Sequence, residues 1–201
     1  MEKSGKRDKS THQRRQLIVE TAIKCFAEKG FHQTSMRDLA KNAGISLGNV
    51  YNHFDSKTAL VQEIATLEAQ EFLEFQSVLE NTRDPVKALD RFLVIYLEAC
   101  SEPEYALLAA EILSEGLRNP EIRSGFLNNR SLLVSTLARV VQEIADKNLL
   151  ILNPSAVDCA ELILDIVEGF SIRQSFSGNS ETNKSAAPVK AGIYRLIGLK
   201  P

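Results

Sequence analysis

The residue types between Thr34 and Lys57 are suited to reading the edges of DNA bases. The second half of this window is short and polar, and it places Gly48 inside a predicted helix, where glycine costs roughly 1 kcal/mol relative to alanine. We interpret the missing side chain as room for another surface to approach closely. Asn49 and Asn52 carry amides of the kind that pair with adenine in the major groove.

Two short helices must hold that polar segment in place. Ser35 and Asp38 have the spacing of a capping box, which begins a helix that ends near Gly44. Gly44 allows the positive φ of a tight turn, and Ser46 caps the next helix. The spacing predicts a helix-turn-helix unit, whose second helix enters the major groove. The alternative is a small helical hairpin with a frayed turn.

The rest of the chain also has the pattern of helices, so we predict an all-α fold of about nine helices. A first helix from about Thr11 to Lys29 has an apolar stripe and stops at Gly30. We predict a polar loop over residues 177–188 and a last helix from about Val189 to Leu199. The other helix starts, mostly an acceptor before proline, are Asp55-Ser56, Asp84-Pro85, Glu102-Pro103, Asn119-Pro120 and Asn153-Pro154.

The composition is that of one or two compact domains, with 201 residues, 44% hydrophobic and 25% charged. No apolar run approaches the roughly 20 residues that span a bilayer, and the N-terminus has no apolar signal segment. We therefore expect a cytoplasmic protein with no membrane partner.

Charge is distributed unevenly along the chain. Residues 1–62 contain eleven Lys or Arg and six Asp or Glu residues, a net charge of +5, although the whole chain carries −2. The remainder therefore carries −7, which favours nucleic acid binding at one end. We expect residues 1–10 to form a basic, flexible arm that either follows the DNA or adds diffuse attraction only.

Nothing in the sequence suggests an enzyme. No Gly-rich phosphate loop is present, and the three histidines, His12, His32 and His53, lie in the N-terminal end and form no pair at i, i+4, so we expect no catalytic residue, metal or cofactor. The three cysteines, Cys25, Cys100 and Cys159, lie far apart, and we expect small buried hydrophobes rather than a disulfide framework. A thiol sensor is the alternative.

One segment matches a known DNA-binding domain without a gap, through Gly30-Phe31, Thr34-Ser35, Leu39-Ala40, Ala43-Gly44-Ile45-Ser46, Gly48, Tyr51, His53-Phe54, Lys57 and Leu60. These residues resemble the TetR family of bacterial transcriptional regulators. The resemblance implies a helix-turn-helix domain over residues 1–55 and a helical effector-binding and dimerisation domain over residues 56–201. It also implies a homodimeric repressor on the bacterial nucleoid, which binds a palindromic operator in double-stranded DNA and is released by a small, largely apolar effector.

The resemblance assigns roles to single residues. Tyr51, His53 and Lys57 stand where family members contact phosphates, and each carries a donor. Arg37 stands where some members read a guanine. Leu47 and Asn52 both depart from common usage in the family, so the resemblance predicts no particular operator sequence. The complete set of expected DNA-binding residues is Thr34, Ser35, Arg37, Ser46, Leu47, Gly48, Asn49, Tyr51, Asn52, His53 and Lys57.

Simpler structural roles remain open for several of these residues. Tyr51 could pack beneath the recognition helix, His53 could cap that helix, and Arg37 could pair with Asp38 or with solvent.

In the C-terminal part, the resemblance implies an effector pocket and a dimer seam. The aromatic residues expected near the effector are Phe72, Phe75, Phe92, Tyr96, Tyr105 and Phe126, for which plain core packing is the alternative. The expected four-helix seam consists of Ile163, Ile166, Val167, Phe170, Ile193, Leu196 and Ile197. We expect the acidic series Asp158, Glu161, Asp165 and Glu168 to face solvent.

Two other functions stay open. A structural or cell-division protein on the same scaffold would bind many DNA sites without an inducer. An effector-binding module would use its helix-turn-helix for protein contacts, and its binding would depend little on salt.

Overall fold

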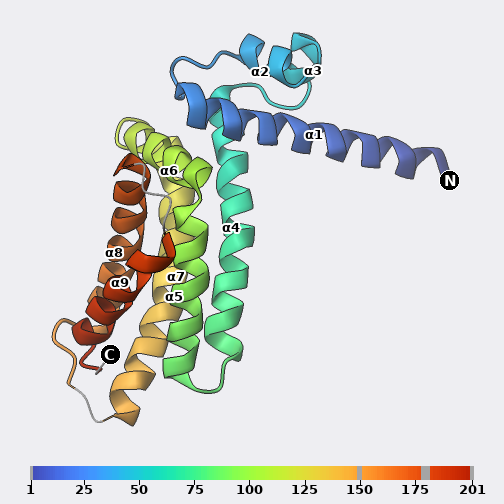
Figure 1. Cartoon of the computed structure of the whole chain (residues 1–201). Helices are drawn as coiled ribbons and strands as arrows, with labels where there is room; N and C mark the ends of the chain where they lie inside the picture. Colours follow the sequence, from blue (N-terminus) through green and yellow to red (C-terminus); the bar gives the residue numbers. More distant parts are fainter. Residues whose placement is uncertain (1, 149–150, 178–181, 200–201) are drawn as a thin grey trace. The chain divides into compact units, whose positions relative to one another are not determined.

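The computed structural model describes residues 2–148, 151–177 and 182–199, and the side chains of residues 11–148, 151–176 and 187–199. Over those residues the chain forms nine helices and no strand, which confirms the predicted all-α fold (Figure 1). The helices are α1 (Glu2–Lys29), α2 (Met36–Asn42), α3 (Leu47–Tyr51), α4 (Lys57–Asn81), α5 (Pro85–Ser101), α6 (Pro103–Gly116), α7 (Pro120–Lys147), α8 (Ala156–Ser177) and α9 (Thr182–Leu196).

The chain divides into two compact units. The first comprises Met1–Leu67 with Leu107–Gly125, and the second comprises Glu68–Ala106 with Phe126–Pro201. Most of α6 and the start of α7 therefore belong to the same unit as the helix-turn-helix. These units reflect packing, so the functional division at residue 55 stays a prediction.

In the first unit, α2 packs on α1 and α3 packs on α2 (Figure 1). Leu39 of α2, Val50 of α3 and Ile18 of α1 are all completely buried. The predicted capping box is present, since the Ser35 side chain accepts from the Asp38 N–H and the Asp38 carboxylate accepts from the Ser35 N–H. Gly44 has a φ of +66°, as the tight turn requires.

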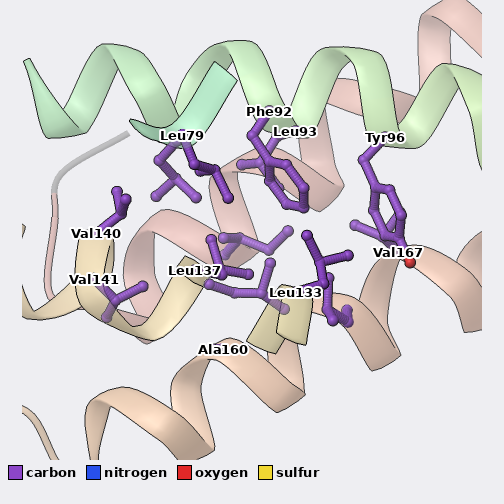
Figure 2. Packing of buried hydrophobic residues seen from close by; sticks show 14 of the residues in the cluster. Leu79, Phe92, Leu93, Tyr96, Leu133, Leu137, Val140, Val141, Ala160 and Val167 are labelled. Carbon is purple, nitrogen blue, oxygen red and sulfur yellow. The ribbon is translucent and has the colours of Figure 1, made fainter. Parts of the chain in front are cut away.

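In the second unit, α5 packs against α8 and α9. Figure 2 shows side chains of α5, α7 and α8 meeting in the interior, among them Phe92, Leu133, Leu137 and Val167. All four are completely buried. The apolar interior fixes the helices that carry the polar side chains described below.

Three helix boundaries differ from the sequence prediction. The backbone of α1 begins at Glu2 rather than near Thr11, so the predicted flexible arm continues the helix; the segment contains no proline to stop it. α8 is capped by Ser155, which exchanges hydrogen bonds with Asp158, one residue after the predicted proline start. α9 begins before Pro188, which therefore lies inside a helix rather than at its start. Residues 178–181 of the predicted loop lie outside the described residues.

Among the described residues, no helix combines the length and the apolar character needed to cross a membrane.

Candidate functional site

The polar face of α3 lies on the surface of the first unit. Gly48 and Asn52 are exposed, as is Ser46 at the cap, whereas Val50 is completely buried. Tyr51 is 48% exposed, so its ring is not a core residue. This arrangement matches a recognition helix held on its inner side by apolar packing and free on its outer side.

Asn49 and Leu47 are half-buried members of the same helix. The Asn49 N–H donates to the Ser46 hydroxyl at 3.2 Å, which caps α3. The Asn49 side-chain oxygen is buried and has no hydrogen-bond partner among the described residues. An unpaired buried oxygen costs about 1–3 kcal/mol, and such groups in native structures often belong to functional sites.

Arg37 and Ser35 lie on the exposed side of α2. The Ser35 hydroxyl already donates to Asp38 at 2.5 Å, so it does not offer a free donor. Hydrogen bonds from Ser35 lower the pKa of Asp38, which keeps that carboxylate ionised at the helix start. No ion pair to Asp38 involves Arg37 among the described residues.

Thr34 corrects the predicted set of DNA contacts. Its side chain is completely buried, and its hydroxyl donates to the carbonyl oxygens of Gly30 at 2.9 Å and Cys25 at 3.2 Å. The Thr34 side chain therefore cannot donate to a phosphate. The sequence could not distinguish it from exposed Ser35, because the two hydroxyls are adjacent.

Lys57 and His53 are both half-buried. The Lys57 ammonium donates to the Phe31 carbonyl at 2.5 Å and lies 4.3 Å from the centroid of the Phe31 ring. Burial lowers the pKa of Lys57, and Glu115 acts in the opposite direction. Lys57 is thus engaged inside the protein, at the first residue of α4.

Arg15 is a positioning residue that sequence reasoning missed. Its guanidinium donates to both carboxylate oxygens of Glu63, at 2.7 and 3.1 Å, and to the His53 carbonyl at 3.1 Å. It also lies 4.2 Å from the Phe54 ring centroid. Arg15 therefore ties α1 to α4 and to the end of the recognition helix. Its partners lie 38 and 48 residues away, beyond any local pattern.

The segment that contains this exposed helix is similar in sequence to known proteins. Residues 18–64, which run from α1 into α4, match the sequence model of the bacterial regulatory proteins of the tetR family. The N-terminal part of the chain is therefore a DNA-binding domain of the TetR type.

Relatives extend the similarity beyond the DNA-binding end. The HTH-type transcriptional regulator UidR of Escherichia coli K12 is 28% identical over 159 residues, which cover 77% of this chain and 78% of UidR. The HTH-type transcriptional repressor KstR2 of Mycolicibacterium smegmatis is 32% identical over 91 residues, 43% of this chain and 42% of KstR2. The solved structure of Salmonella enterica GusR has a TM-score of 0.72 at 24% identity, and the match covers 92% of this chain and 95% of GusR. With this DNA-binding domain and these regulator relatives, the chain is a DNA-binding transcriptional regulator.

The second unit of the regulator contains a cluster of aromatic rings. Phe75 and Phe92 have ring centroids 5.2 and 5.1 Å from that of Tyr96, and Phe72 lies 5.9 Å from Phe75. Tyr105 is partly buried against this core. Phe126 is half-buried outside it. The predicted effector role of these residues stays a prediction, because the structure shows their packing alone.

Polar side chains lie beside the aromatic cluster. The Tyr96 hydroxyl donates to Glu168 at 2.7 Å, and Arg130 donates to both oxygens of Glu168 at 2.7 and 2.9 Å. The Asn129 amide donates to Glu68 at 2.9 Å. Burial raises the pKa of Glu68 to about 7, and the nearby carboxylates Glu168 and Glu71 act in the same direction.

The acidic series on α8 is not simply a solvated face. Arg130 of α7 forms ion pairs with Glu161 at 3.1 Å, Asp165 at 2.6 Å and Glu168 at 2.7 Å. Their spacing of four and three residues places the three carboxylates on one side of the helix. That side faces α7, which the sequence of α8 alone could not reveal.

The predicted dimer seam needs a larger correction. Ile163 and Val167 on α8 are completely buried within the unit, as is Ile193, and Ile197 is 1% exposed. These four residues are core residues of the subunit itself. By contrast, Ile166 is 37% exposed, and Phe170 and Leu196 are partly buried.

The three cysteines are free and buried, as predicted. Burial raises the pKa of Cys100 to about 12, and it also raises the pKa of Cys159. A buried thiol with a raised pKa is poorly reactive. Among the described residues, no three His, Cys, Asp or Glu side chains are grouped as metal ligands.

Proposed function

We propose that this regulator is a repressor that binds a palindromic operator as a homodimer and leaves it when a small effector binds. The observation that carries the proposal is the outward polar face of α3, with Val50 buried on its inner side. The relatives named above, one of them a repressor, support the same function.

The proposed base-reading surface consists of Arg37 from α2 and of Gly48, Asn49 and Asn52 from the recognition helix. A methyl group at Gly48 would meet no atom of the protein within 4 Å. Packing within the chain therefore does not require glycine there, which supports close approach by an outside surface. Tyr51 supplies an exposed hydroxyl for a phosphate.

The proposed dimer seam uses the outer face of α8. Leu162 is 39% exposed, Ile166 is 37% exposed and Phe176 is 92% exposed. These residues share one side of the helix with Gly169, where an added methyl group would meet no atom within 4 Å. An apolar stripe with a small residue allows a second copy of the helix to approach closely. The two recognition helices of such a dimer must lie about 34–36 Å apart to enter successive major grooves.

The proposed effector is small and largely apolar, and its site is the aromatic cluster around Tyr96. The neighbouring carboxylate of Glu68 gives the cluster a polar side, so the effector carries a donor group at one end. Release of DNA then requires that the effector bind one conformation more tightly than the other.

Genomic footprinting with the purified protein tests the proposal. We expect protection of a few compact palindromes beside genes, and loss of that protection in the Arg37→Ala, Tyr51→Ala double variant. Protection of many dispersed sites would instead indicate a structural DNA-binding protein. Binding that hardly changes with salt would indicate that phosphates are not contacted.

A further inference from the structure

The loop between α1 and α2 is held at one residue, Phe31, from two sides. Lys57, at the start of α4, donates to the Phe31 carbonyl at 2.5 Å. Glu111 of α6 accepts from the Phe31 N–H at 3.0 Å. The Lys57 ammonium lies over the Phe31 ring, 4.3 Å from the centroid of that ring. Two oppositely charged side chains thus grip one residue, an arrangement that we call the Phe31 clamp.

The residues next to Phe31 strengthen this grip. Gly30 has a φ of +82°, and a methyl group added there would lie 3.2 Å from a carboxylate oxygen of Glu111. Glycine is therefore the residue that lets both the turn and Glu111 fit. His32 lies 2.8 Å from the carboxylate of Glu115, which is 8% exposed.

The clamped loop leads directly into the helix-turn-helix. Thr34 donates to the Gly30 carbonyl, and the next residue, Ser35, caps α2. Only a few residues therefore separate Phe31 from the first turn of α2, and α3 packs on α2. A shift at Phe31 would move the base-reading surface.

We propose that Lys57 is a positioning residue and not a phosphate ligand: together with Glu111 it holds Phe31, and thereby α2 and α3, in the DNA-reading position. The inference rests on the proposed function and departs from the role that the family resemblance implies for Lys57. Its support is the engagement of the ammonium by a carbonyl and an aromatic ring of the same unit.

The two roles of Lys57 predict different salt behaviour. A phosphate ligand releases counterions, so its loss weakens binding to all sequences alike and lowers the slope of log affinity against log salt by about 1. A positioning residue affects only the contacts that need an aligned recognition helix. Its loss lowers affinity for the operator, leaves affinity for random DNA unchanged and leaves the salt slope unchanged.

The experiment compares Lys57→Met, Glu111→Ala and the double variant by fluorescence anisotropy at several salt concentrations. The probes are a duplex selected by the wild-type protein from a random pool and an unselected duplex of equal length. We expect each single variant to lose about tenfold in operator affinity, as for a hydrogen bond to a charged group. The double variant loses no more than either single one, because both side chains act through Phe31. Lys57→Arg, which keeps the cation, restores binding.

Two controls separate the clamp from other effects. Lys41→Met removes an exposed cation from α2, and Glu104→Ala removes an exposed carboxylate from α6; neither should reproduce the tenfold selective loss. Thermal unfolding and stoichiometric titration measure how much of each variant is folded and active. Equal weakening on both duplexes with a lower salt slope in Lys57→Met would overturn the inference, as would unchanged operator affinity in both single variants. Failure of the wild-type protein to select any duplex would instead overturn the proposed function.

Discussion

At the scale of single residues, a substitution at Gly48 should change the stability of the fold and the affinity for DNA in opposite directions. Because a methyl group there meets nothing within 4 Å, Gly48→Ala should raise the free energy of unfolding by roughly 0.5–1 kcal/mol. The same methyl group occupies space that the operator needs, so operator affinity should fall. Urea unfolding and anisotropy measure the two effects. A variant that is both more stable and equally tight in binding would show that α3 does not approach DNA at this residue.

Glu68 predicts how stability depends on pH. Its pKa rises from 4.5 in the unfolded chain to about 7 in the fold, so the folded state binds the proton more tightly. The free energy of unfolding should therefore fall as pH rises from about 4.5 to 7, by on the order of 3 kcal/mol in total, with the loss complete above pH 7.

Glu68→Gln should remove this pH dependence and stabilise the protein at pH 8. Denaturant unfolding at pH 5 and pH 8 measures the difference, and Glu74→Gln, an exposed carboxylate on the same helix, is the matched control. An identical pH dependence in wild type and Glu68→Gln would refute the assignment.

The sequence predicted hydrogen bonds and turns between neighbouring residues, but it did not predict contacts between residues far apart in the chain. The capping box of Ser35 and the positive φ of Gly44 follow from residue types a few positions apart, and both were predicted. Lys57 donates a hydrogen bond to the Phe31 carbonyl. The Phe31 N–H in turn donates to Glu111, which lies 80 residues further along the chain. No local pattern identifies such partners, so the sequence does not reveal that Lys57 is half-buried and hydrogen-bonded within the chain.

At the scale of helices, the sequence predicted where helices start better than it predicted which side of each helix is buried. Acceptor-proline pairs located α5, α6 and α7 correctly, because caps are local. α8 carries two apolar stripes, an inner one with Ile163 and Val167 and an outer one with Leu162 and Ile166. Periodicity finds both stripes but does not say which one the subunit buries.

The outer stripe gives a prediction about assembly. Ile166→Glu places a charge in the proposed seam but outside the core, since Ile166 is 37% exposed. We expect a folded monomer with little change in thermal stability of the subunit and a large loss of operator affinity. Sedimentation velocity across a range of concentrations measures the change. A dimer as stable as that of wild type would move the seam elsewhere.

At the scale of the whole molecule, the charge distribution agrees with binding at one end. The net charge of +5 over residues 1–62 includes the helix-turn-helix, while the chain as a whole carries −2. Such a basic end raises the rate of encounter with DNA and makes affinity depend on salt. We propose that sequence specificity then comes from Arg37 of α2 and from the exposed face of α3.

Directed cleavage of the operator tests most directly whether that face lies in the major groove. The three native cysteines are buried, so Asn52→Cys offers a single exposed thiol for an iron–EDTA reagent. We predict cleavage within the two half-sites, centred about 10–10.5 base pairs apart, and none from wild-type protein treated with the same reagent. Cleavage that is absent although the labelled variant still binds the operator, or that is equal with wild-type protein treated with the reagent, would contradict the account.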